Sequence, residues 1–193
     1  MLKGLRSIFD VSLESFVKRD IANILANVSE RTLCGNLCCS LHDELQKTDY
    51  RNYFVDVEYN RKQNGEIKTY INEKFEVIKI NCDLIVHTRG ATISNDNLIC
   101  IEMKKTGRPK QELINDRNRL IALTKISFND VWSNDGHTHP EHVCGYKLGV
   151  YIIMDLKNKY FDIEYYFEGK LVETRKVSYW KKLWVMKTQK IAY

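Results

Sequence analysis

Residues 98–104, Leu-Ile-Cys-Ile-Glu-Met-Lys, form an apolar run that ends in two opposite charges. Successive side chains of a strand point to opposite faces, so Glu102 and Lys104 share one face while Ile101 and Met103 share the other. A glutamate and a lysine are costly to bury without partners. We therefore predict a strand of a central sheet whose charged end opens onto a site.

The neighbouring segments alternate between helical and strand periodicity. Apolar residues recur at helical spacing, Ser29 can cap a helix, and Pro109 suits a first helical turn. We predict helices over residues 10–27, 29–47 and 109–126 and strands over 53–59, 75–80, 83–87, 98–104 and 146–154. Residues 160–167 and 170–177 predict a hairpin turned at Glu168-Gly169. In the tail, Trp180 and Trp184 stand at helical spacing and are expected to pack on the domain.

This element order predicts an α/β fold with a central mixed sheet and helices on both sides. The 193 residues are enough for one domain, with the C-terminal hairpin and a basic tail over residues 156–193. The composition, 44% hydrophobic and 28% charged, is that of an ordinary globular protein.

Sequence features also bear on location and partners. No apolar run approaches the roughly 18 residues of a membrane span, and no apolar segment follows the N-terminal charges as in a secretory signal. We therefore expect a cytoplasmic protein that does not associate with membranes and whose six cysteines stay reduced. The net charge of +5 mildly favours a polyanionic partner.

Asp83 opens the strand expected beside residues 98–104 and can lie across from Glu102. Two carboxylates at short distance repel each other, which favours a divalent cation between them. Oxygen ligands suit Mg²⁺ or Mn²⁺, and such a metal polarises a phosphodiester and lowers the pKa of a bound water. Lys104 would then orient that water or stabilise the charge that develops on phosphorus.

Asp83, an 18-residue gap and Glu102-Met103-Lys104, followed by a helix containing Asp116-Arg117-Asn118-Arg119-Leu120, resemble the PD-(D/E)XK nuclease superfamily. The resemblance covers residues 28–155 and is strongest to small bacterial stand-alone members, although Cys82 stands where a proline is usual. It implies a restriction-endonuclease-like core and a Mg²⁺- or Mn²⁺-dependent endonuclease acting on DNA, in phage defence or a mobile element. It also makes a homodimer an expectation. A catalytically inactive module that binds nucleic acid or a partner on the same fold is the alternative.

Members of this superfamily usually carry an acidic residue on a preceding helix, and Glu30 resembles that residue. Glu30 lies on the helix face of Leu33, Leu37 and Leu41, so the resemblance assigns it to the metal with Asp83 and Glu102. Two alternatives remain: Glu44 shares the same stripe, and Glu30 can simply be a favourable charge at a helix N-terminus.

Several basic residues flank these segments. Arg61, Lys105, Arg108 and Lys110 are candidates for contact with a nucleic-acid backbone. Their alternatives are a pair between Arg61 and Glu58 and, for the other three, a solvated basic face.

Two sets of His and Cys residues could in principle bind zinc. One set lies in the polar loop His137-Thr138-His139-Pro140-Glu141-His142-Val143-Cys144, whose spacing matches no ligand pattern. The other, Cys34, Cys38 and His42, recurs along one helix face, for which helix packing is the favoured interpretation.

Overall fold

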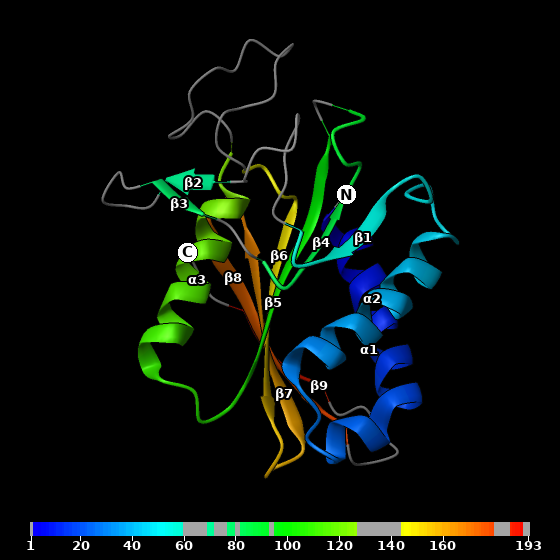
Figure 1. Cartoon of the computed structure of the whole chain (residues 1–193), viewed down its shortest axis with the longest axis vertical. Helices are drawn as coiled ribbons and strands as arrows, with labels where there is room; N and C mark the ends of the chain where they lie inside the picture. Colours follow the sequence, from blue (N-terminus) through cyan, green and yellow to red (C-terminus); the bar gives the residue numbers. More distant parts are fainter. Residues whose placement is uncertain are drawn as a thin grey trace.

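The computed structural model describes residues 2–59, 69–71, 77–79, 82–92, 95–126, 144–179 and 186–190. Within these residues the chain forms an α/β fold with a seven-stranded mixed sheet and a separate two-stranded ribbon (Figure 1). The sheet has the order β1-β4-β5-β6-β7-β8-β9. Its strands are β1 (Phe54–Val57), β4 (Leu84–His87), β5 (Asn97–Lys105), β6 (Leu148–Asp155), β7 (Tyr160–Phe167), β8 (Lys170–Ser178) and β9 (Met186–Lys190).

Strand direction places β5 at the turning point of the sheet. β5 and β6 are parallel, because α3 (Lys110–Thr124) carries the chain back between them, and every other neighbouring pair is antiparallel. β5 therefore lies inside the sheet, between the antiparallel β4 and the parallel β6. The ribbon pairs β2 (Thr69–Ile71) with β3 (Val77–Lys79).

The helices lie on opposite faces of the sheet (Figure 1). α1 (Leu2–Leu25) and α2 (Glu30–Leu45) cover one face, and α3 covers the other. Alternation along β5 feeds both cores: Ile101 and Met103 join the α1–α2 core, whereas Cys100 joins the α3 core with Leu120 and Tyr151. The predicted α/β architecture with helices on both sides is confirmed.

The structure has the predicted elements in the predicted order, with an earlier start of α1 and two additional strands. α1 begins at Leu2 rather than at residue 10, because Leu5 and Phe9 are fully buried against the domain. β2 and β9 were not predicted. β9 pairs with the outer edge of β8, and neither strand shows the strong apolar pattern of an interior strand. The expectation that Trp180 and Trp184 pack on the domain concerns residues outside the described part of the chain.

Ser29 caps α2 as predicted, since its hydroxyl accepts a hydrogen bond from the Thr32 amide at 3.1 Å. This cap fixes where α2 begins and therefore places Glu30 in the first helical turn. Among the described residues, no helix has the length and apolar character needed to span a membrane.

The contact between α3 and β6 leaves no room at Gly149. A Cβ there would lie 2.8 Å from Thr124 Cγ2 and 3.0 Å from Tyr166 Cβ. We predict that Gly149→Ala lowers the free energy of unfolding by about 1–3 kcal/mol, as overpacking does. Gly35→Ala on α2 is the matched control, because nothing lies within 4 Å of its Cβ position.

In a helix interior, alanine at residue 35 is expected to gain about 0.5–1 kcal/mol over glycine. Urea unfolding of the two variants measures the difference. Equal stabilities would show that α3 does not pack as closely on β6 as the structure indicates.

Candidate functional site

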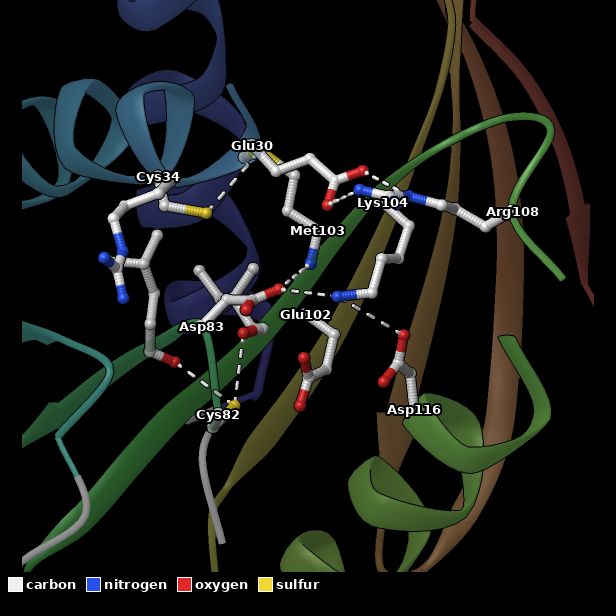
Figure 2. Close-up of polar contacts among 12 residues, drawn as sticks. Glu30, Cys34, Cys82, Asp83, Glu102, Met103, Lys104, Arg108 and Asp116 are labelled. Carbon is white, nitrogen blue, oxygen red and sulfur yellow. Dashed lines mark hydrogen bonds and ion pairs between the residues drawn. The ribbon is translucent and has the colours of Figure 1, made fainter. Parts of the chain in front are cut away.

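Strand pairing brings Asp83 beside Glu102. In the antiparallel register Leu84 pairs with Ile101, so Asp83, which immediately precedes β4, stands level with Glu102. The Asp83 carboxylate accepts a hydrogen bond from the Met103 amide at 2.8 Å, which anchors it to β5 (Figure 2). The predicted juxtaposition of the two acidic residues is therefore present.

Glu102 is a fully buried carboxylate on the α3 side of the sheet. Its exposed fraction is 0%, and its Oε1 atom accepts a hydrogen bond from Arg119 Nη1 of α3. Its Oε2 atom is buried and has no hydrogen-bond partner. An oxygen in this state is rare in proteins because burial without a partner is costly, so it marks a place where a cation or a proton would be stabilised.

Lys104 lies between two carboxylates. Its Nζ atom is 3.8 Å from Asp83 Oδ2 and 3.8 Å from Asp116 Oδ2, and its side chain is 18% exposed. Asp116, on α3, is buried and is held by the Tyr151 hydroxyl, which donates to Oδ2 at 3.2 Å. Lys104 thus faces the same space as Glu102, as strand alternation predicts.

Arg119 closes the arrangement, since its Nη1 atom is also 3.3 Å from Asp116 Oδ1. We call Asp83, Glu102, Lys104, Asp116 and Arg119 the charge cluster. Negative and positive groups alternate along the path Asp83, Lys104, Asp116, Arg119, Glu102. The alternation breaks between Glu102 and Asp83, where two acidic groups are neighbours.

The pKa values of these two acids reflect that contact. Burial raises the pKa of Glu102 well above its usual range, and the charges of Asp83 and Asp116 add to the effect against the opposing influence of Arg119. Burial also raises the pKa of Asp83, although the hydrogen bond from the Met103 amide and the charge of Lys104 oppose the shift. Burial therefore disfavours the ionised form of both acids, and a nearby cation favours that form.

Glu30 does not join the charge cluster. Its Oε1 atom accepts from the Lys105 amide at 3.0 Å, and both carboxylate oxygens accept from Arg108, at 3.2 and 3.0 Å (Figure 2). Partial burial alone would raise the pKa of Glu30, but the hydrogen bonds from Arg108 and Lys105 lower it. The structure therefore places the expected third metal ligand in a separate ion pair at the end of β5.

The four expected nucleic-acid contacts have different surroundings. Lys105 points to the opposite face from Lys104, and its ammonium donates to the carbonyls of Asn27 and Val28 at 3.2 and 2.5 Å. Arg108 pairs with Glu30 and keeps 48% of its side chain exposed, and Lys110 is exposed at the start of α3. Arg61 lies outside the described residues.

Asp116 and Arg119 belong to the helix pattern of the resemblance, but neither of them, nor Tyr151, was predicted to be a site residue. The signal that could have found the first two is their i, i+3 spacing, which places an acid and a base on one face of α3. Their contact with β5 depends on the crossover of α3 onto the sheet, which local sequence does not reveal.

The cysteines of α2 pack against the sheet. The Cys34 thiol lies 3.8 Å from Met103 Sδ, and the Cys38 thiol donates to the Val55 carbonyl at 3.4 Å. Of the His- and Cys-rich loop, residues 137–143 lie outside the described part of the chain, and Cys144 is buried. In the described ranges, no three or more His, Cys, Asp or Glu side chains are grouped so that they could hold a metal.

A divalent cation would therefore rest on two carboxylates of this chain. The Oε2 atom of Glu102 lacks a partner, and Asp83 is its acidic neighbour, so the donor chemistry fits Mg²⁺ or Mn²⁺. Mg²⁺ usually keeps several water ligands and is held by one or two carboxylates, so two protein carboxylates are enough for it.

Comparisons with protein-family models, with curated proteins and with solved structures found no match to this chain. The chemistry of the charge cluster is consequently the basis for assigning a function.

The raised pKa of Glu102 predicts a pH-dependent stability. The folded chain holds this proton more tightly than the unfolded chain, so the stabilisation is complete below the ordinary value of 4.5 and is lost as pH rises above it. We expect Glu102→Gln, which cannot ionise, to gain stability relative to wild type by up to about 1.4 kcal/mol per pH unit above that value.

Denaturant unfolding of both chains at a series of pH values measures the difference. Glu112→Gln, on the exposed surface of α3, is the control and should run parallel to wild type. Parallel profiles for Glu102→Gln as well would contradict the assignment of a raised pKa to this glutamate.

Proposed function

We propose that the chain is a metal-dependent endonuclease that hydrolyses phosphodiester bonds in DNA, on a restriction-endonuclease-like core. The observation that carries the proposal is the position of Asp83 level with buried Glu102, whose Oε2 atom has no hydrogen-bond partner, beside the Lys104 ammonium. Support for the core comes from the element order α2-β1-β2-β3-β4-β5-α3-β6, in which β4, β5 and α3 bring these groups together at one end of β5.

Each residue of the site has a distinct role in this proposal. Asp83 and Glu102 would hold Mg²⁺ or Mn²⁺, and the cation would supply Lewis-acid activation of the phosphodiester and a water of lowered pKa. Lys104, held between Asp83 and Asp116, is placed to orient that water or to stabilise charge on the phosphoryl oxygens. Glu30 is better assigned to holding Arg108 against the end of β5, because both of its oxygens are engaged there.

DNA enters the proposal through charge and through the resemblance to the nuclease superfamily. Arg108 and Lys110 are exposed directly after β5, where a phosphate backbone that reaches Lys104 would pass. Exposed basic side chains position a backbone without selecting a sequence, so this surface suits nonspecific phosphate contact.

One observation favours the alternative of an inactive binding module. Arg119 already neutralises Glu102, so the folded chain does not need a metal to accommodate that carboxylate. On this alternative the charge cluster would be a structural ion network, and nucleic acid or a protein partner would bind elsewhere.

Cleavage of supercoiled plasmid distinguishes the two functions. We expect nicking in Mg²⁺ or Mn²⁺, and we expect Glu102→Gln and Lys104→Met each to slow it by about 10²-fold or more, since preorganised electrostatic groups contribute that much. Asp83→Asn should show a loss of similar size, because it removes the other carboxylate of the proposed metal site.

Glu112→Gln and Lys157→Met are the matched controls, because both residues are exposed and lie outside the charge cluster. They should cleave at the wild-type rate. Equal nicking by wild type and folded Glu102→Gln would refute the catalytic role, and DNA binding without metal-dependent cleavage would favour the binding module.

A further inference from the structure

Arg119 is the one member of the charge cluster that touches Glu102 directly from α3. We infer that Arg119 sets the divalent-cation affinity of the site by standing in for the metal on Glu102. The inference rests on the proposed metal site, and it assigns Arg119 a positioning role that the nuclease proposal does not require.

The first support is that Arg119 binds only the Oε1 atom of Glu102. Glu102 has no exposed surface, so its ionised form requires a cation nearby. Arg119 Nη1 supplies that cation to Oε1, while Oε2 stays without a partner. Arg119 thus supplies the counter-charge of Glu102 when no metal is bound, and the Oε2 atom of Glu102 stays available to an incoming ion.

The second support is that the Arg119 side chain can move to a second acidic partner or to solvent, whereas the buried Glu102 side chain cannot. Arg119 Nη1 lies 3.3 Å from Asp116 Oδ1, and the Arg119 side chain is 21% exposed. Asp116 is itself fixed by the Tyr151 hydroxyl and lies near Lys104. A cation that binds Glu102 and Asp83 can therefore displace Arg119 toward Asp116 and solvent without leaving a buried charge unpaired.

The consequence is competition between like charges. The Arg119 guanidinium on Glu102 repels a divalent ion that approaches the same carboxylate. The ion must therefore displace the guanidinium, which lowers its affinity for the site. Lys104 does not compete in this way, because its contacts are with Asp83 and Asp116, each at 3.8 Å.

Binding of Mn²⁺, followed by the loss of the free-ion signal in electron paramagnetic resonance, tests this role without relying on cleavage. We expect Arg119→Gln to bind Mn²⁺ at least about tenfold more tightly than wild type, because it removes the competing positive charge. Arg119→Lys, which keeps the charge but loses the guanidinium fork, should fall between the two. A gain in affinity is not what general damage to the fold produces.

Arg31→Gln is the matched control, since it removes an equal charge and one ion pair, with Glu58, from an exposed position on α2. It should bind Mn²⁺ as wild type does. If Arg119→Gln does not fold, Arg119→Lys decides: tighter binding than wild type supports the inference, and equal or weaker binding overturns it.

Glu102→Gln separates this inference from the proposed function. Mn²⁺ binding that is lost in Glu102→Gln but unchanged in folded Arg119→Gln would overturn the role of Arg119 alone. No Mn²⁺ binding by wild type, Arg119→Gln or Arg119→Lys would overturn the metal site and the inference together.

Discussion

The burial of Glu102 beside Asp83 is the constraint on which the rest of the site depends. A carboxylate with no exposed surface is tolerated only where other groups offset the loss of its hydration. Arg119 of α3 forms an ion pair with Glu102, and Lys104 of the same strand lies near Asp83 and Asp116. Because both cations are themselves shared with Asp116, the packing of α3 on the sheet and the electrostatics of the site are one problem, and a change in either alters the other.

The structure also holds α3 in place by contacts outside the charge cluster. Arg117 makes paired hydrogen bonds to Glu164 on β7, and the Tyr166 hydroxyl donates to the same carboxylate at 2.6 Å. On the opposite face, Arg6 of α1 makes paired hydrogen bonds to Glu173 of β8. Charge-assisted bonds of this kind restrict how the helices can slide on the sheet, so the side chains that α3 presents to β5 keep a defined position.

How far the sequence predicts the site depends on which interactions are local. Strand alternation is local, so the shared face of Glu102 and Lys104 followed directly, and the pairing of adjacent strands brought in Asp83. Glu30 was correctly placed in the first turn of a capped helix, but its partner Arg108 is 78 residues away in sequence and no periodicity shows that contact. Asp116 and Arg119 were missed for the same reason, and β9 because an edge strand carries little of the apolar pattern that identifies interior strands.

The charge balance of the cluster separates the two proposed functions by whether each needs a cation. With all groups ionised, the three carboxylates of Asp83, Glu102 and Asp116 exceed the two cations, Lys104 and Arg119, so the cluster carries a net charge of −1. A phosphate is repelled by that charge unless a proton or a metal first offsets it, and a divalent ion would reverse the sign to +1. On the proposed nuclease function, phosphate binding at Lys104 would then be coupled to cation binding. A module that binds nucleic acid without metal would use the exposed Arg108 and Lys110 beyond β5 and would not need Lys104.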